Sequence, residues 1–216
     1  MSRTDRFWDR IAKRYAARPV ADEASYQKKL EITRAYLGET SDVLEIGCGT
    51  GSTAILHAPR VRHIRAVDCS ANMLDIAREK ALEAGVTNID FEKADIDGLD
   101  LRPARYDVVL ALSILHLVDD RDAVIARLFD ALKPGGVLVS STGCVGDDMA
   151  WIRFIAPLGR SVGLLPLIRV FTRAQLRASF ERAGFAIEHD WKPGKGKAVF
   201  IVGRKPEASG CNSGSG

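Results

Sequence analysis

The sequence predicts a doubly wound α/β fold with a mostly parallel sheet and helices on both faces. Short segments rich in branched apolar residues alternate along the chain with segments of helical periodicity, as βαβ units require. The first of these strands ends at Ile46 and runs through a glycine-rich turn into a helix, the junction where such sheets bind ligands. At 216 residues, 46% of them hydrophobic and 27% charged, the chain is large enough for one full core.

Two helices are expected before the first strand. Apolar residues recur at helical spacing from Phe7 to Tyr15, and Pro19 closes this stretch. A second helix is expected between Asp22, which can cap its start, and Gly38, which can end it.

Strands and helices then alternate regularly. The expected strands are Asp42–Ile46, Ile64–Val67, Ile89–Glu92, Tyr106–Leu112 and Gly136–Ser141. The helices expected between them are Ser52–Ala58, Ala71–Ala84 and Asp122–Leu132. This order indicates parallel strands joined by right-handed crossovers.

The last part of the chain predicts one more helix and two paired strands. Thr172 begins a capping-box pattern that opens a helix ending at Gly184. The strands are expected at Ala186–Trp191 and Ala198–Val202. Because the connection between them, Lys192–Lys197, is short, we expect an antiparallel pair that ends the sheet.

Composition and charge exclude several classes of protein. A formal net charge of +3 is too mild to indicate a nucleic-acid partner without a clustered basic patch. The four cysteines are scattered without a C-x-x-C pair, so no metal site is expected and a reducing, cytoplasmic location fits best. The polar N-terminus lacks a signal-peptide core, and no apolar run reaches the roughly 18 residues of a membrane span.

Three alternating glycines, Gly47, Gly49 and Gly51, follow the first strand and let the backbone turn tightly against a ligand. A dinucleotide-binding turn has the pattern G-x-G-x-x-G, and Ser52 occupies its third glycine position, which argues against a nicotinamide cofactor. At the end of the second strand, Asp68 offers the two acceptor oxygens that suit the ribose hydroxyls of any adenosine.

A further acidic position follows the third strand. Asp95 can accept a hydrogen bond from an adenine amino group, and the backbone N–H of Ile96 can reach a ring nitrogen. A solvated carboxylate in a charged loop is the alternative for Asp95. Together with Asp68, this position favours an adenosine-containing cofactor.

Five stretches of the chain resemble the class I S-adenosylmethionine-dependent methyltransferases, in the order and spacing of that family. They are V-L-E-I-G-C-G-T-G, V-D-C-S-A-N-M-L, A-D-I, Y-D-V-V-L-A-L-S-I-L-H-L and L-K-P-G-G-V-L, and they cover residues 43–138. The resemblance implies a seven-stranded sheet with a reversed final strand and S-adenosyl-L-methionine as the cofactor.

The same resemblance implies a role for individual residues. The three loop glycines would hold the methionine and ribose portions of the cofactor, while Glu45 orders the loop and Asp68 binds the ribose. Met73 would pack near the adenine, and Leu112 would lie beneath the cofactor. Asp95 and Ile96 would bind the adenine edge. For Met73, packing in the core is the alternative.

The resemblance also implies a division of the chain into parts. We expect a single methyltransferase domain over residues 1–206, with a helical lid at 1–38 and an apolar cap insertion at 149–171. Residues 207–216 are rich in glycine and serine, which predicts a disordered tail. Tyr15, Tyr26 and Trp151 are the aromatic residues expected to contact the acceptor.

A small, apolar or aromatic acceptor is favoured by the apolar insertion. Oxygen is the accepting atom expected first, with carbon, nitrogen and sulfur left open. The insertion is equally compatible with a helix pair packed on the sheet, or with contact with a membrane surface. The stretch Leu110–Ser113 lacks the polar-Pro-Pro-aromatic tetrad of enzymes that methylate nucleic-acid bases or glutamine, so base methylation is disfavoured.

His116 lies just past the fourth strand and is the candidate general base for a hydroxyl acceptor, although a structural role is the alternative. Other functions remain open. A protein or RNA methyltransferase would need a basic docking surface, for which Lys192–Lys197 is the one candidate. A non-catalytic protein that binds S-adenosylmethionine is a third hypothesis.

Overall fold

The computed structural model describes residues 3–149, 151 and 166–207. Most of the expected insertion at 149–171, and nearly all of the expected tail at 207–216, lie outside the described residues. Among the described residues, no helix combines the length and the apolar character needed to cross a membrane.

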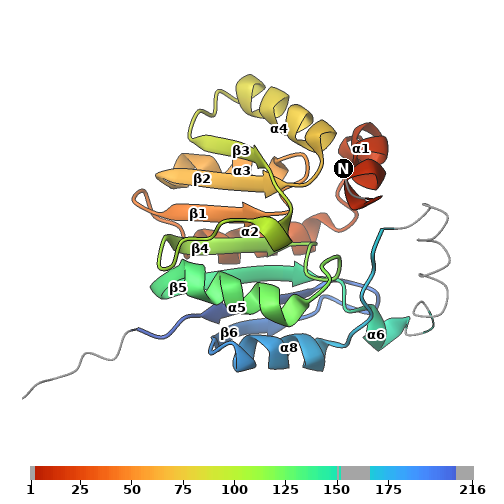
Figure 1. Ribbon diagram of the computed structural model, residues 1–216, viewed down its shortest axis with the longest axis vertical. Coiled ribbons are helices and arrows are strands. Elements are labelled where there is room, and N and C mark those ends of the chain that lie inside the picture. The colour runs from red at the N-terminus through yellow and green to blue at the C-terminus, as the bar shows by residue number, and fades with distance from the viewer. Residues whose placement is uncertain (1–2, 150, 152–165, 208–216) are drawn as a thin grey trace, which may run out of the picture.

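The described part of the chain forms one sheet of seven strands (Figure 1). They are β1 (Asp42–Ile46), β2 (His63–Asp68), β3 (Ile89–Lys93), β4 (Tyr106–Leu112), β5 (Leu132–Thr142), β6 (Ala186–Trp191) and β7 (Val199–Arg204). Their order is β3-β2-β1-β4-β5-β7-β6, and β7 runs in the direction opposite to that of the other six strands. The predicted fold class, with its reversed last strand, is therefore confirmed.

Helices cover both faces of this sheet. In chain order they are α1 (Arg3–Ala16), α2 (Glu23–Arg34), α3 (Ser52–His57), α4 (Ala71–Glu83), α5 (Arg121–Ala131), α6 (Val145–Asp148) and α8 (Arg173–Arg182). Two short 3-10 turns, Ala58–Arg60 and Ile96–Gly98, follow α3 and β3. Helices α5 and α8 lie in front of the sheet in Figure 1 and bury Leu128 and Phe180, whereas α3 and α4 bury Ala54 and Leu74 on the other face.

The switch point of the sheet lies beside β1. This strand pairs with β2 on one side and with β4 on the other, so the sheet grows from β1 to β3 in one direction and from β4 onward in the opposite direction. In doubly wound sheets a crevice opens at this point, outside the carboxyl ends of the strands. Helix α1 lies beyond these carboxyl ends and beside α4 (Figure 1).

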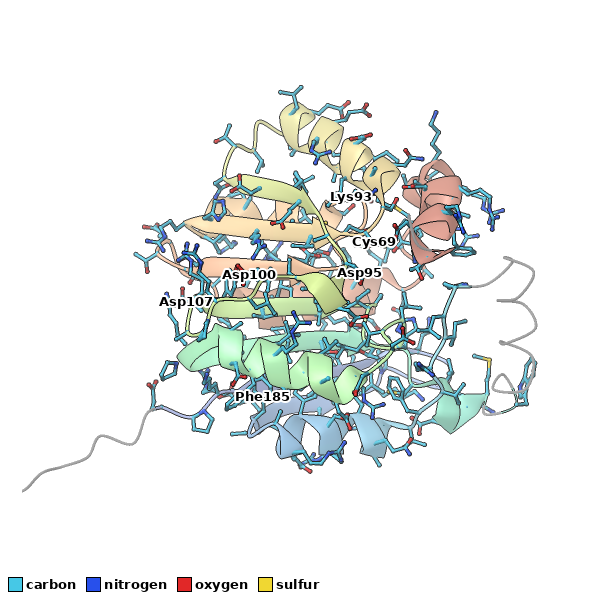
Figure 2. The ribbon with its side chains drawn as sticks, in the orientation of Figure 1. Cys69, Lys93, Asp95, Asp100, Asp107 and Phe185 are labelled. Atoms are coloured by element: carbon cyan, nitrogen blue, oxygen red, sulfur yellow. The ribbon has the colours of Figure 1, made fainter. Side chains whose placement is uncertain are left out.

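Charged residues at the amino ends of the strands are paired with one another. Asp107 lies at the amino edge in Figure 2, where it accepts hydrogen bonds from Lys133 and from the backbone of Asp42. Asp42 is buried and ion-paired with Arg62 and Arg105. Because these carboxylates are paired within the fold, the amino edge is a structural ion-pair network.

Two predicted boundaries differ from the structure. Strand β5 begins at Leu132, four residues before the predicted start, because Gly135 and Gly136 exchange backbone hydrogen bonds with Lys205 despite the intervening turn-like sequence. Helix α2 ends at Arg34, and Gly38 lies beyond it in the connection to β1. There the Gly38 backbone N–H donates to the side chain of Ser41.

Gly51 is fixed by packing. It has a φ of +71°, and a Cβ at this position would lie 2.8 Å from the Cβ of Ala77 and 3.1 Å from the ring of Phe91. The third loop glycine therefore allows α4 and β3 to approach the start of α3.

We expect Gly51→Ala to lower the free energy of unfolding by about 2–4 kcal/mol, from backbone strain plus the steric clash. Gly85→Ala is the matched control, since Gly85 has a φ of +67° with nothing within 4 Å of its added Cβ. Gly85→Ala should lower the free energy of unfolding by the backbone strain alone, about 1 kcal/mol. Urea titrations measure both, and equal losses would show that close packing at Gly51 does not matter.

Candidate functional site

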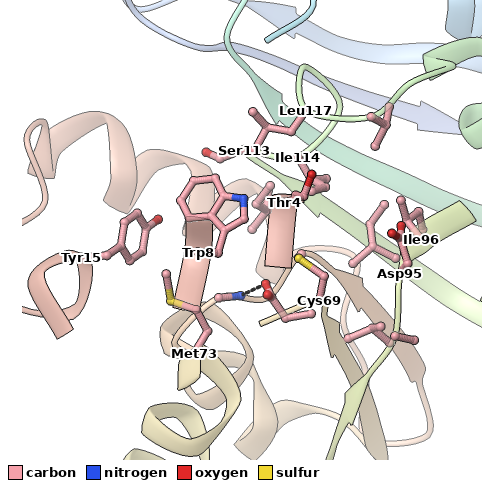
Figure 3. A pocket seen from close by; sticks show the side chains of 18 residues that line it. Thr4, Trp8, Tyr15, Cys69, Met73, Asp95, Ile96, Ser113, Ile114 and Leu117 are labelled. Atoms are coloured by element: carbon pink, nitrogen blue, oxygen red, sulfur yellow. Dashed lines mark hydrogen bonds between the residues drawn. The ribbon is translucent and has the colours of Figure 1, made fainter. Parts of the chain in front are cut away.

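A cavity opens at the carboxyl ends of β1, β2 and β4, under α1 (Figure 3). Its walls come from segments that are far apart in the sequence: α1, the glycine turn, the end of β2 with the start of α4, the turn after β3, and the end of β4. The residues that line it are Thr4, Trp8, Tyr15, Ile46, Gly47, Gly49, Val67, Asp68, Cys69, Met73, Ala94, Asp95, Ile96, Leu112, Ser113, Ile114, Leu117 and Val118.

The floor of the cavity is the turn after β1. Gly47 and Gly49 have φ values of +64° and +53°, which glycine adopts without strain. A Cβ on Gly47 would lie 2.9 Å from Ile114, so any larger residue would close the space between the turn and the end of β4. The bare backbone of this turn is therefore exposed to whatever the cavity holds.

Asp68 holds this turn in place. Its Oδ2 accepts a 2.8 Å hydrogen bond from the Gly49 backbone N–H, the dashed line in Figure 3, and its Oδ1 accepts one of 2.9 Å from Ser70. Burial raises the pKa of the Asp68 carboxyl, which these two hydrogen bonds partly offset. Each carboxylate oxygen can accept further hydrogen bonds, so Asp68 can bind a pair of hydroxyls while it orders the turn.

One end of the cavity is an apolar slot. Met73 is buried at the start of α4, and Cys69 and Ile96 lie across from it in Figure 3. Asp95 marks the polar end of this slot and caps the 3-10 turn that Ile96 begins. Such a slot, apolar on its faces with one carboxylate at its rim, suits a flat heteroaromatic ring that carries an amino group.

Helix α1 covers the cavity. Trp8 lies over the Asp68–Gly49 hydrogen bond in Figure 3, and Trp8 and Tyr15 meet edge to face with their ring centroids 6.2 Å apart. Burial and the nearby Asp68 raise the pKa of Tyr15. A ligand in the cavity would thus be shielded from water by two aromatic rings.

A second cavity adjoins the first and shares with it Tyr15, Gly47, Gly49, Leu112 and Ser113. Its further walls come from the connection between α1 and α2, from α2 itself and from residues 193–198, and they include Tyr26. This cavity is more polar than the apolar slot. The two together form a space that can hold two ligands side by side.

Lys29 and Ser113 line this second cavity, and sequence reasoning missed both. Lys29 donates a 2.8 Å hydrogen bond to the hydroxyl of Ser141, and burial lowers the pKa of its ammonium. Ser113 has a φ of +59°, a strained conformation for a residue with a side chain. Nothing in the sequence distinguishes a site lysine from any other lysine within a helix. Ser113, however, directly follows β4 at the switch point, and this position could have indicated a site residue.

Glu45 faces the second cavity and lies outside the walls of the first. It is buried, and its Oε2 has no hydrogen-bond partner among the described residues. Burial, with a smaller contribution from Asp68, raises its pKa to about 8. The carboxyl is therefore protonated in the free protein at neutral pH.

Three predicted site residues lie outside both cavities. Gly51 packs against α4 and β3, as described above. His116 is partly buried with its ring beside Gly143, and desolvation lowers its pKa to about 4. Trp151 is 58% exposed and lines neither cavity, while most of the insertion that it begins lies outside the described residues.

The one basic loop that could dock a macromolecule is largely neutralised. Lys192 is ion-paired with Asp148 at 2.5 Å, and Lys197 with Asp22 at 3.2 Å. Two of its three lysines are therefore engaged within the fold, which weakens the hypothesis of a protein or RNA substrate.

Part of the chain is similar to a known family of domains. Residues 43–136 match the family described as "Methyltransferase domain". The ubiquinone biosynthesis O-methyltransferase of Idiomarina loihiensis is 40% identical over 125 residues, which are 57% of this chain and 51% of that protein. The chain spans about half of the length of the curated relatives it matches.

Solved structures share the fold. An S-adenosylmethionine-dependent methyltransferase from Mesorhizobium loti superposes with a TM-score of 0.71 at 22% identity, covering 85% of this chain and 99% of that one. The [4+2]-cyclase SpnF superposes with a TM-score of 0.70 at 19% identity, covering 88% and 84%. The fold therefore occurs in proteins whose names describe different reactions.

Glu45 gives the stability of the free protein a specific pH dependence. Its folded pKa of about 8 exceeds the ordinary 4.5, so between these values the folded chain keeps a proton that the unfolded chain has lost. The free energy of unfolding therefore falls as pH rises, by about 1.4 kcal/mol per pH unit from this group. Glu45→Gln cannot ionise and should lack this contribution.

Urea titrations of the unsubstituted protein and of Glu45→Gln, at several pH values between 4.5 and 8, measure this contribution of Glu45. The difference between the two free energies of unfolding cancels the other titrating groups. Glu92→Gln, at an exposed and ion-paired position, is the control and should follow the unsubstituted protein. A constant difference between Glu45→Gln and the unsubstituted protein across this range would show that Glu45 ionises normally.

Proposed function

We propose that the chain is a class I, S-adenosylmethionine-dependent methyltransferase domain that transfers a methyl group from S-adenosyl-L-methionine to a small molecule. A hydroxyl oxygen is the accepting atom we propose first. The observation that carries this proposal is the pair of adjoining cavities at the switch point, one with the features that an adenosine needs and a second, more polar one beside it.

The residues present fit the cofactor. The apolar slot between Met73 and Ile96 matches an adenine ring, and Asp95 offers an acceptor for its amino group. Asp68 can bind the ribose hydroxyls. The turn of Gly47 and Gly49 leaves room for the amino-acid portion, and a side chain at Gly47 would collide with Ile114.

Methyl transfer asks little more of the protein than alignment. The cofactor supplies a methyl group activated on a sulfonium, and the protein holds donor and acceptor in line and excludes water. Trp8 and Tyr15 on α1 cover the cavity and provide that exclusion. Leu112 and Ser113 line both cavities, so we place the acceptor beside them.

The acceptor is proposed to be a hydroxylated molecule with an apolar or aromatic body. The relatives named as O-methyltransferases of ubiquinone biosynthesis support a small-molecule acceptor and an oxygen atom. Tyr26 in the second cavity offers a ring for stacking, and Lys29 offers its ammonium to a carboxylate, whether of the cofactor or of the acceptor. Trp151 remains proposed as a contact from the insertion.

His116 is proposed as the base that takes the hydroxyl proton. Of the chain's four histidines it is the one that directly follows the end of β4, and its low pKa keeps the imidazole neutral at pH 7. The same low pKa makes His116 a weak base, so its contribution to kcat should be modest unless the bound acceptor raises the pKa of the imidazole.

Two neighbouring hypotheses differ in what they produce. The structural likeness to a [4+2]-cyclase shows that the fold also occurs in a protein named for another reaction, so the alternative hypothesis is a protein that binds S-adenosylmethionine without consuming it. Release of S-adenosylhomocysteine in the presence of an acceptor distinguishes transfer from such binding.

We also propose a cytoplasmic location, supported by the free thiols of Cys48, Cys69 and Cys144.

Asp68→Ala should weaken binding of S-adenosylhomocysteine about tenfold to a hundredfold, through the loss of charge-assisted hydrogen bonds. Asp68→Asn keeps the shape and separates the loss of charge from the loosening of the turn. Asp90→Ala, at an exposed position on β3, is the control and should bind normally. Isothermal titration measures the affinities, and unchanged binding by both Asp68 variants would remove this residue from the site.

His116→Ala should lower kcat about 10²-fold with a hydroxyl acceptor if His116 is the base. With an acceptor that is already ionised, such as an acidic phenol, the same substitution should have little effect. His189→Ala, far along the chain on β6, is the control. An equal loss with both acceptors would mean that His116 acts only through packing.

A further inference from the structure

We propose that Asp9 is the latch that holds α1 closed over the cofactor cavity, and is thus a positioning residue for the reaction proposed above. The inference rests on that proposed function for its consequence in catalysis. The latch itself is a contact between α1 and α4, which can be tested without any cofactor.

Three hydrogen bonds join Asp9 to the start of α4. Its Oδ1 accepts from the hydroxyl of Ser70 at 2.6 Å and from the backbone N–H of Asn72 at 3.1 Å. The side-chain amide of Asn72 donates in return to the Asp9 backbone carbonyl at 3.0 Å. One carboxylate and one carbonyl of α1 thus bind two successive polar residues of another helix.

The position on α4 strengthens these bonds. Ser70 is the N-cap of α4 and is fully buried, and its hydroxyl accepts from the Met73 backbone N–H while it donates to Asp9. A negative charge at a helix N-terminus is stabilised by the helix dipole and by unsatisfied backbone N–H groups. Asp9 therefore caps α4 from outside, through charge-assisted hydrogen bonds.

The latch is next to the residues that close the cavity. Trp8 precedes Asp9 on α1 and lies over the glycine turn, and Ala12, one turn further along, is buried. On the other side of the latch, Ser70 is two residues after Asp68 and three before Met73. The lid and two walls of the cofactor cavity are therefore tied at one point.

Arg6, Lys13 and Arg14 are exposed on the outer side of α1, and α1 lies outside the sheet, so no strand pairing holds it. Beyond the connection that follows α1, the ion pair of Asp22 with Lys197 anchors the start of α2. Breaking the Asp9 contacts would thus free α1 to move as a unit on the connection that follows it.

This arrangement gives the latch a kinetic role. A cofactor enclosed by Trp8 and Tyr15 can leave only when α1 moves away, so the strength of the latch sets how long the cofactor stays. Asp9 lines neither cavity and needs no contact with the ligand for this effect.

Stopped-flow measurements with S-adenosylhomocysteine, followed by intrinsic tryptophan fluorescence, to which Trp8 contributes, test this role. Asp9→Ala should raise the dissociation rate about tenfold or more, because charge-assisted bonds are lost, and leave the association rate within about twofold. Asp9→Asn keeps an acceptor oxygen for Ser70 and Asn72 and should restore most of the residence time. Glu79→Ala, on the exposed side of α4, should behave like the unsubstituted protein.

Hydrogen exchange on the cofactor-free protein separates the latch from the proposed function. Asp9→Ala should speed exchange in residues 3–16 at least tenfold while the sheet strands stay protected, and Asp9→Asn should not. Unchanged exchange in α1 would overturn the latch. Faster exchange in α1 with no binding of S-adenosylhomocysteine even by the unsubstituted protein would overturn the proposed function and leave the latch standing. Faster exchange with an unchanged dissociation rate would overturn the kinetic role.

Discussion

The hydrogen bond from the Gly49 backbone N–H to Asp68 is the interaction on which the site depends. It joins the turn after β1 to the end of β2, beside the switch point between β1 and β4. Glycine is needed on one side because the turn is left-handed and passes close to Ile114. A carboxylate is needed on the other side, because one group must both hold the turn and accept bonds from a ligand.

The remaining walls follow from this junction. The chain continues from Asp68 through Cys69 to the Ser70 cap of α4, so the wall of the apolar slot and the start of the helix are fixed together. Asp9 fastens the covering helix to that same cap. Floor, wall and lid of the cavity thus meet within three residues of chain, which explains how a helix outside the sheet can be placed accurately over the turn.

Much of the fold and of the candidate site could be predicted from the sequence, because the signals were local. The glycine turn, the carboxylates after β2 and β3 and the alternation of strands and helices each occupy a few consecutive residues. The early start of β5 could not, since it depends on pairing with Lys205, 70 residues away in the chain. The same holds for Lys29, which reaches Ser141, and for Asp9, which reaches Ser70. Gly51 carried a signal that fitted either ligand contact or helix packing, and only the neighbouring Ala77 decides for packing.

Calorimetric titration of the purified chain with S-adenosylmethionine, S-adenosylhomocysteine and NAD in parallel tests the central claim most directly. The first cavity has an apolar slot with Asp95 at its rim and Asp68 beside the glycine turn, a second cavity adjoins it, and Ser52 stands where a dinucleotide-binding turn has its third glycine. We therefore expect micromolar binding of the two sulfur compounds and none of NAD. Binding of NAD alone would contradict the assignment of the glycine turn and of Asp68 to a methyl-donor site.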